Sequence, residues 1–193
     1  MRVVIDGNIG SGKSTQVSML SQMGFKCYKE PIHDWPLDLF YKDQTRWGFL
    51  LQMKILESYS DPSDNCIYER CMQSSKDVFW YNLVVNNVVT QTEDNIYTDW
   101  YRKTVWKPEV TIYLRSLPEE CYKKIQNREQ AGDRTISLDY LRQIHDYYQL
   151  MAYKNKDYHV IDVDGKNPQT IHGEILSVLK SENAMFLVNT QWT

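Results

Sequence analysis

The sequence predicts a single α/β domain in which a five-stranded parallel sheet is flanked by helices. Short apolar segments alternate along the chain with longer helical stretches, which is the pattern of a parallel sheet with crossover helices. The chain has 193 residues, within the usual size of one domain, and it contains no repeat, low-complexity tract or linker. We therefore expect residues 1–193 to fold as one domain.

Five short apolar segments are the expected strands. They are Val3–Ile5, Lys26–Tyr28, Cys66–Tyr68, Val110–Leu114 and His159–Val163. The first of them begins almost at the start of the chain, so we expect no targeting segment before the fold.

Helices are expected in the stretches between the strands. One begins at Lys13, a long one covers Gln44–Tyr59, one follows Arg70, one begins at Pro118, and one runs from Ser137 to about Tyr153. Ser137 stands directly before an apolar run that begins at Leu138, which is a typical N-cap position. The last ten residues fit either a disordered tail or a docked segment.

The polar connection at about residues 127–137 lies between the last two of these helices and contains Gly132. Two interpretations are open for it. A solvated loop would have this composition, and so would a lid that closes over a substrate.

Composition and charge exclude several classes of partner. The formal net charge is −3, and basic residues form no run beyond pairs such as Lys123-Lys124, so a nucleic-acid polymer is not an expected partner. No apolar run approaches the ~20 residues that span a membrane. The four cysteines form no C-x-x-C pair, which suits reduced thiols in the cytoplasm.

A glycine-rich motif directly follows the first expected strand. It reads Gly7-Asn8-Ile9-Gly10-Ser11-Gly12-Lys13-Ser14, with Thr15 next, and fits G-x-x-x-x-G-K-[ST]. Glycines let backbone N–H groups wrap around phosphate oxygens, and the helix that begins there adds its positive end. Lys13 is expected to reach the β- and γ-phosphates of ATP, and the Ser14 hydroxyl to bind Mg²⁺. We therefore predict a P-loop NTPase-type fold; the alternative is a glycine-rich turn with no ligand.

The motif indicates the phosphate donor but not the acceptor. Phosphoryl transfer also needs a group that takes the acceptor's proton and cations that stabilise the developing charge. Glu30 follows the second expected strand, at the edge where an open parallel sheet binds ligands, and Pro31 holds its backbone extended. Glu69 and Arg70 follow another expected strand, so we expect them at the same edge.

Several further motifs stand in a characteristic order. They are Glu30-Pro31-Ile32-His33-Asp34-Trp35, Tyr41-Lys42-Asp43 with Trp47 and Gln52, Glu69-Arg70-Cys71, Ile112-Tyr113-Leu114-Arg115 with Pro118-Glu119, and Arg128–Leu141. With these motifs the chain resembles the deoxynucleoside kinase family, which includes deoxycytidine, deoxyguanosine and mitochondrial thymidine kinases. The multisubstrate insect enzyme looks most similar, and herpesviral thymidine kinases look more distant. The resemblance extends from the P-loop to Asp164.

The resemblance implies a role for each catalytic residue, with a small deoxynucleoside as the acceptor. Glu30 is the general base on the 5′-hydroxyl, and Arg70 steadies that oxygen and the transferring phosphoryl group. Glu69 helps to hold Mg²⁺. Asp162 and Asp164 belong to a loop near the adenine of the donor.

The resemblance also implies how the acceptor is bound. Tyr41 and Asp133 bind the sugar 3′-hydroxyl, Asp133 standing where the family has Glu. Gln52 reads the base edge, Phe79 stacks on the ring and Trp35 lines the pocket. A carboxamide donates and accepts hydrogen bonds together, so Gln52 suits the adjacent C=O and N–H of a pyrimidine.

The lid departs from the family pattern. Arg128 belongs to the lid that closes on the phosphates and is expected to act in catalysis. The family has further arginines at regular spacing, whereas this chain has Gln126 and Gln130 there. Arg134 could supply a second charge from a different point. Cys71 stands where the family motif has Ser.

Three positions are expected to tune the base preference. Relatives that prefer deoxycytidine or purines carry Asp where this chain has Ser75 and Arg where it has Tyr59. Thymidine-preferring relatives carry Ala at the first position, and the herpesviral type has Tyr at the second. Ser75 leaves room for a 5-methyl group, and Tyr59 and Ile55 add apolar surface. We therefore expect thymidine as the favoured acceptor and deoxycytidine as a second one.

Two alternatives remain open. Thymidylate kinases have Arg-Glu-Pro-Gly and Asp-Arg-Tyr, whereas this chain has Lys29-Glu30-Pro31-Ile32 and Glu69-Arg70-Cys71, with no obvious additional cation beside Glu30. A nucleotide-binding switch module would need Asn-Lys-x-Asp, and Asn155-Lys156-Asp157 has the wrong spacing. The resemblance further implies a homodimer through the two helices nearest Gln44–Tyr59. The compact length suggests a viral or minimal member, which would act in the host cytoplasm.

Overall fold

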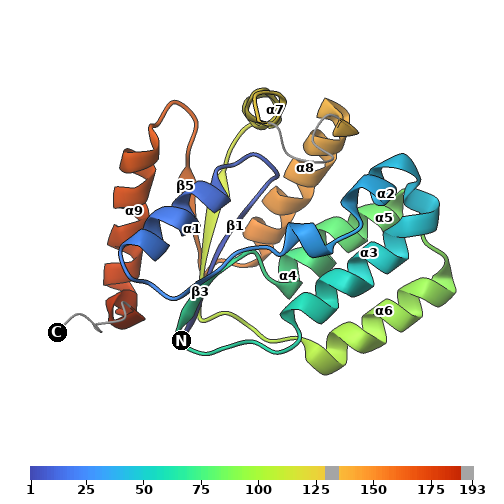
Figure 1. Ribbon diagram of the computed structural model, residues 1–193, viewed down its shortest axis with the longest axis horizontal. Helices are drawn as coiled ribbons and strands as arrows, with labels where there is room; N and C mark the ends of the chain where they lie inside the picture. The colour runs from blue at the N-terminus through green and yellow to red at the C-terminus, as the bar shows by residue number, and fades with distance from the viewer. Residues whose placement is uncertain (129–134, 188–193) are drawn as a thin grey trace.

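A five-stranded parallel sheet lies at the centre of the computed structural model, which describes residues 1–128 and 135–187 (Figure 1). The strands are β1 (Arg2–Gly7), β2 (Cys27–Tyr28), β3 (Cys66–Glu69), β4 (Val110–Arg115) and β5 (Tyr158–Asp162). Their order is β2-β3-β1-β4-β5, so β1 lies in the middle. In the register, Val3 pairs with Ile67 on one side and with Val110 on the other. The predicted fold class and all five predicted strands are confirmed, with ends that differ by one or two residues.

The helices expected from the sequence are present. They are α1 (Lys13–Gln22), α3 (Gln44–Tyr59), α7 (Pro118–Gln126) and α8 (Leu138–Lys154). The stretch expected after Arg70 is divided into α4 (Met72–Ser74), a π-helical segment (Ser75–Trp80) and α5 (Tyr81–Val85). Ser137 caps α8 as predicted, because its side chain accepts a hydrogen bond from the backbone N–H of Tyr140.

Three more helices lie outside the sequence-based prediction. They are α2 (Leu37–Lys42), α6 (Gln91–Thr104) and α9 (Pro168–Ser181). The start of α6 carries a recognisable signal, because Thr90 and Glu93 form a capping box in which each side chain accepts from the other residue's backbone N–H. The start of α9 carries a weaker one, since Asn167 caps it through the N–H of Thr170. Among the described residues, no helix has both the length and the apolar character needed to cross a bilayer.

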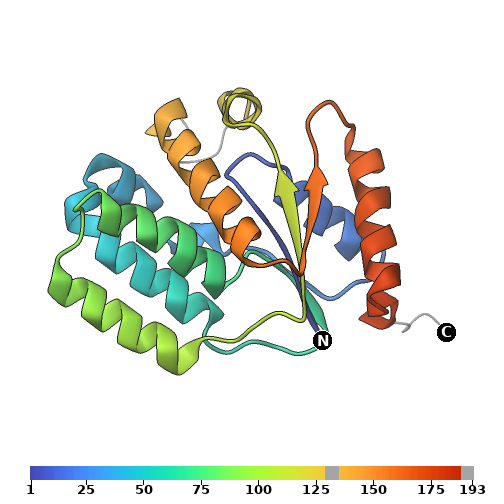
Figure 2. The same cartoon turned by 180° about the vertical axis from the view of Figure 1, so that it is seen from behind.

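The helices cover both faces of the sheet, as Figures 1 and 2 show from opposite sides. Val3 and Ile5 of β1 point to one face and pack in a core with residues of α1 and α9. Val4 points to the other face and packs against residues of α3 and α6. This alternation is the two-residue period of a strand, and it explains why β1 is apolar on both sides.

The end of the chain docks in part. Ala184 and Leu187 lie in a short 3₁₀ turn (Ala184–Leu187) and are buried in the core beside α9. The first of the last ten residues therefore belong to the domain, and residues 188–193 lie outside the described part of the chain.

Candidate active site

A cavity of about 410 Å³ lies at the carboxyl-terminal edge of the sheet. Most of the predicted site residues line this cavity. Those that line it are Ile9, Gly10, Lys13, Ser14, Glu30, Trp35, Tyr41, Gln52, Ile55, Glu69, Arg70, Ser75, Phe79 and Arg128. The fold therefore brings the predicted phosphate cradle and the predicted acceptor residues to one cavity, at the edge where open parallel sheets bind ligands.

The backbone of the P-loop requires glycine at its ends. Gly7 has a φ of 147°, and a Cβ there would lie 2.5 Å from the carbonyl oxygen of Leu114. Gly12, with a φ of 96°, turns the chain into α1. Lys13 lies inside this turn, and its ammonium donates a hydrogen bond to the Asn8 carbonyl at 2.9 Å. Burial lowers the pKa of Lys13 to about 8, and the nearby charge of Arg70 acts in the same direction.

The remaining P-loop residues serve different purposes. The Asn8 side chain donates to the Leu141 carbonyl at 2.9 Å and so ties the loop to α8. Ser11 is buried in the turn. Thr15 is exposed on α1 and does not line the cavity, although it belongs to the sequence-based nucleotide-binding set.

Glu30 and Arg70 form an ion pair at the cavity wall, in which Arg70 is buried and Glu30 is partly buried. The Arg70 Nε donates to Glu30 Oε1 at 2.7 Å, and the guanidinium lies 4.5 Å from the ring centroid of Phe79. Arg70 has a φ of 66°, and its backbone N–H donates to Ile5 at the end of β1. Burial raises the pKa of Glu30, and the positive charge of Arg70 opposes that rise. A carboxylate with a raised pKa is a better proton acceptor near neutral pH.

Ser14 and Glu69 lie together where the sequence predicts a metal site. The Ser14 hydroxyl donates to Glu69 Oε1 at 2.5 Å, and both residues line the cavity. Hydroxyl and carboxylate oxygens are the ligand type that Mg²⁺ prefers, usually alongside waters and phosphate oxygens. The residues present therefore fit Mg²⁺.

A polar pair, Gln52 and Ser75, also lines the cavity. The Ser75 hydroxyl donates to Gln52 Oε1 at 3.1 Å, and both side chains are buried. Trp35 is held in the wall by a hydrogen bond from its Nε1 to Ser58 at 3.0 Å. One lone pair of Gln52 Oε1 and its amide hydrogens remain unused by this bond, so the amide keeps capacity for a ligand.

The expectation that Tyr59 adds apolar surface to the base pocket is wrong. It does not line the cavity, because its hydroxyl donates to the backbone carbonyl of Glu69 at 3.0 Å and its ring packs near Trp35. The last turn of α3 lies against β3 rather than against the cavity. Tyr59 therefore supports the wall from behind and adds no apolar surface for a base.

The two loop aspartates also lie outside the cavity lining. Asp162 pairs with the Arg115 guanidinium at 2.5 and 2.8 Å. Asp164 accepts from the Ser116 hydroxyl at 2.5 Å and from the Leu117 backbone at 2.7 Å. Both carboxylates fasten this loop to the end of β4, so any contact of the loop with an adenine would come from its backbone.

Part of the predicted lid is not described by the structure. Asp133, Arg134 and Gln130 lie in residues 129–134, outside the described part of the chain. Arg128, directly before them, lines the cavity.

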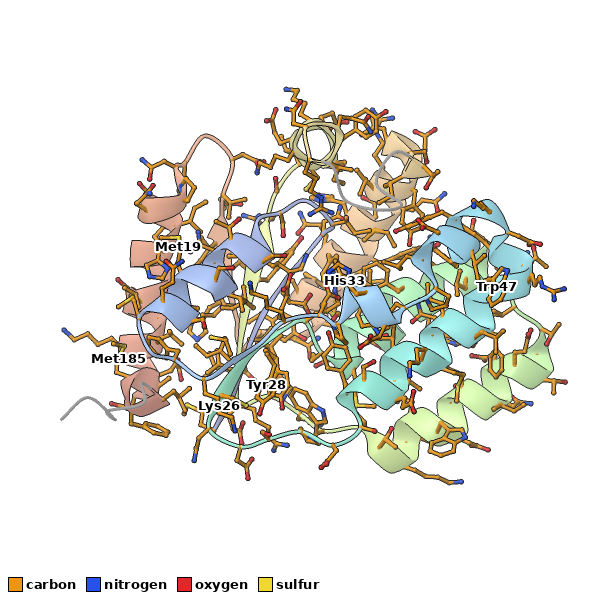
Figure 3. The ribbon with its side chains drawn as sticks, in the orientation of Figure 1. Met19, Lys26, Tyr28, His33, Trp47 and Met185 are labelled. Atoms are coloured by element: carbon orange, nitrogen blue, oxygen red, sulfur yellow. The ribbon has the colours of Figure 1, made fainter. Side chains whose placement is uncertain are left out.

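Several cavity residues escape the sequence-based selection. Lys29 and His33 line the same cavity as Glu30, so two basic residues lie where the sequence suggested no obvious cation. Figure 3 shows His33 in the middle of the view, on the short 3₁₀ turn (Ile32–Asp34) that precedes α2. The signal for Lys29 was its place directly before Glu30. Apolar wall is added by Phe40 and Leu51, which lie in none of the motifs, and by Ile136 and Tyr140, which lie in the Arg128–Leu141 motif but were assigned no role.

Comparison with known proteins gives a consistent result. A family model described as "Deoxynucleoside kinase" matches residues 3–184. The chain is 29% identical over 187 residues to a probable deoxycytidine kinase of Fowlpox virus, covering 85% of this chain and 78% of that protein. It is 28% identical over 165 residues to mitochondrial thymidine kinase 2 of Macaca fascicularis, covering 76% and 62%.

A solved structure shares the fold as well. Deoxyadenosine kinase from M. mycoides with bound dCTP superposes with a TM-score of 0.83 and 26% identity, covering 94% of this chain and all of that one.

Proposed function

We propose that this chain, which belongs to the deoxynucleoside kinase family, transfers the γ-phosphoryl group of ATP to the 5′-hydroxyl of a deoxynucleoside, with Glu30 as general base. One observation carries the proposal. The Glu30–Arg70 ion pair, the P-loop Lys13 and the Gln52–Ser75 pair all face one cavity. A donor phosphate site, a proton acceptor and a polar pair for a base are thus within reach of a single bound nucleoside.

The residues divide the work of the reaction. Glu30 takes the proton of the 5′-hydroxyl, because its raised pKa favours accepting a proton as the new bond forms. Arg70, held against Glu30, faces the oxygen that attacks and the phosphoryl group that moves. Lys13 and Arg128 add positive charge where the phosphate oxygens gather.

Mg²⁺ is proposed to bind between Ser14 and Glu69. Held by these two residues, Mg²⁺ would supply positive charge that stabilises the phosphate oxygens during transfer. The short contact between the Ser14 hydroxyl and the Glu69 carboxylate keeps both oxygens on the phosphate side of the cavity.

The acceptor is proposed to be thymidine, with deoxycytidine as a second substrate. The Gln52 amide presents a donor beside an acceptor. Rotation of the carboxamide by 180° exchanges the two, so one orientation matches thymine and the other matches cytosine. Ser75 suits both orientations, because a hydroxyl can donate to Oε1, as it does here, or accept from Nε2. Since Tyr59 lies behind the wall, the preference for the 5-methyl group rests on Ser75 and Ile55. Tyr41 is proposed to bind the sugar, and Phe79 to stack on the base.

Gln52→Ala tests whether the Gln52 carboxamide recognises the base of the nucleoside. We expect KM for thymidine to rise by about tenfold to a hundredfold with a smaller change in kcat, because a buried bidentate contact is lost. Steady-state kinetics with thymidine and deoxycytidine measure this. The matched control is Gln73→Ala, because Gln73 is also a glutamine but does not line the cavity. An unchanged KM and unchanged base preference would remove Gln52 as the reader.

Lys29 and His33 favour a second candidate function. A nucleoside monophosphate as acceptor needs cations beside the general base, and these two residues line the cavity. The test is ADP formation from ATP and Mg²⁺ with thymidine, deoxycytidine, deoxyguanosine, deoxyadenosine or dTMP, one at a time. Turnover with thymidine or deoxycytidine supports the proposed function, and turnover with dTMP alone supports a thymidylate kinase. ATP hydrolysis that ignores every acceptor would favour a switch module.

The sequence analysis expected a homodimer through the two helices nearest Gln44–Tyr59; we now propose that α3 (Gln44–Tyr59) itself and its neighbour α6 form the interface. Leu50, Ile96 and Trp100 are between 43% and 53% exposed on these two neighbouring helices. Apolar side chains gathered on one face are typical of an interface. We expect sedimentation at twice the 22.9 kDa chain mass, and a shift toward monomer in Trp100→Glu but not in the exposed control Tyr153→Glu. Monomeric wild-type protein would contradict the proposal.

A further inference from the structure

Two residues that do not line the cavity lie close to Arg70. Asp6 lies on β1, directly before the first glycine of the P-loop, and Tyr148 lies on α8. Both are buried, and neither lines the cavity. They stand 142 residues apart in the sequence and meet through a hydrogen bond.

The hydroxyl of Tyr148 stands between two opposite charges. It accepts a hydrogen bond from Arg70 Nη1 and donates one to Asp6 Oδ1 at 2.7 Å. The direct distance from Arg70 Nη1 to Asp6 Oδ1 is 4.0 Å, which is too long for a hydrogen bond. The Asp6 oxygen is fixed in turn by the backbone N–H of Gly7 at 2.8 Å.

The ring of Tyr148 has little freedom to move. It stacks on Tyr113, with centroids 5.5 Å apart and an interplanar angle of 12°. Phe79 meets it edge-on, with centroids 6.3 Å apart. The position of the hydroxyl is therefore set by packing, independently of the charges on either side.

Two carboxylates compete for one guanidinium at this point. Glu30 holds Arg70 Nε at 2.7 Å on the cavity side, and Asp6 lies on the opposite side. A direct charged hydrogen bond is much stronger than attraction across 4.0 Å in a buried site. Without the hydroxyl, a shift of about 1 Å would bring Arg70 into direct contact with Asp6 and away from Glu30.

We propose that Tyr148 is a positioning residue for phosphoryl transfer: its hydroxyl keeps Asp6 from pairing directly with Arg70 and so holds the guanidinium against Glu30. The inference rests on the proposed roles of Glu30 and Arg70 in the reaction. A displacement of about 1 Å in a reacting group can lower the rate on the order of a hundredfold, so this spacing matters for kcat.

Tyr148→Phe tests the inference with the ring retained. We expect kcat to fall by about tenfold to a hundredfold, with an unchanged KM for the nucleoside because the ring that packs against Phe79 is retained. The matched control is Tyr113→Phe. Its ring stacks on Tyr148, and within residues 1–128 and 135–187 its buried hydroxyl has no hydrogen-bond partner, so kcat should be retained.

A second substitution separates positioning from packing. Asp6→Asn keeps an oxygen for the Gly7 N–H but removes the competing charge. In the Tyr148→Phe background it should therefore restore most of the lost kcat. If Tyr148 only supported the fold, a further change at buried Asp6 would lower kcat again. Wild-type kcat in Tyr148→Phe, or a double variant slower than the single one, would overturn the inference.

A measurement that needs no turnover keeps this inference distinct from the proposed function. The ¹⁵Nε–Hε signal of Arg70, assigned with Arg70→Lys, reports its bond to Glu30. It should shift in Tyr148→Phe, return in the double variant and stay unchanged in Tyr113→Phe. An unshifted signal in Tyr148→Phe would refute the positioning role. Wild-type protein without nucleoside-dependent turnover would refute the proposed function instead, and the signal would still decide the role of Tyr148.

Discussion

Glu30→Gln is expected to lower kcat by about 10²–10⁴-fold, since the carboxamide cannot take the proton of the 5′-hydroxyl. The substitution keeps the shape of the side chain and an oxygen that can accept from Arg70 Nε. Nucleoside binding should therefore persist, and isothermal titration with thymidine would measure it alongside the steady-state rate. Retained turnover would remove Glu30 as the base.

The pH dependence of the wild type gives a second view of the same residue. Burial raises the pKa of Glu30, so its basic form is lost as the pH falls through that raised value. We expect kcat/KM to fall on the acidic side at a higher pH than an ordinary glutamate would give. The buried and charged groups around it are Lys13, Arg70, Glu69 and Tyr59. Glu30→Gln should lose this acidic limb, and a limb that persists would assign it to another group.

Lys13→Met has the second largest expected effect. Its ammonium is buried in the P-loop, and burial lowers its pKa to about 8, which leaves it mostly charged at neutral pH. Removing a preorganised charge from the phosphate oxygens should lower kcat by about 10²–10³-fold. ATP affinity should fall too, because the charge also binds the ground state. The measurement is kcat and the KM for ATP at saturating thymidine.

Lys124→Met is the matched control for this variant. Lys124 is exposed on α7 and does not line the cavity, so kcat and the KM for ATP should match the wild type. Equal losses in both variants would show that the effect comes from net charge. An unaffected Lys13→Met would place the donor phosphates elsewhere.

The elements that could be predicted are those with strong local signals. The P-loop is fixed by glycines whose φ values other residues rarely adopt, so the motif determines both turn and helix start. The bounds of α3 agree with the prediction because Asp43 accepts from the N–H of Arg46 as a cap. α6 and α9 were not predicted, although a capping residue marks the start of each. In α6 the buried face consists of Tyr97, so the apolar period that indicates a helix is weak there.

The candidate site could be predicted where a motif carries it, and not where a distant contact does. Tyr59 was expected in the pocket from its position in the family pattern. A sequence pattern does not show which way a side chain points. Tyr59 lies seven residues, about two turns, after Gln52 on α3, and its hydroxyl donates to the backbone carbonyl of Glu69. The hydrogen bond between Asp6 and Tyr148 joins residues 142 apart in the sequence, and no local sequence pattern predicts a contact over that separation.

The product made from ATP, Mg²⁺ and thymidine shows most directly whether this chain is a deoxynucleoside 5′-kinase. ³¹P NMR and mass spectrometry of the reaction mixture measure which atom carries the transferred group. The proposed kinase activity predicts ADP and thymidine 5′-monophosphate in equal amounts. ADP with free inorganic phosphate and unchanged thymidine would contradict it, as would a phosphate on the 3′-oxygen.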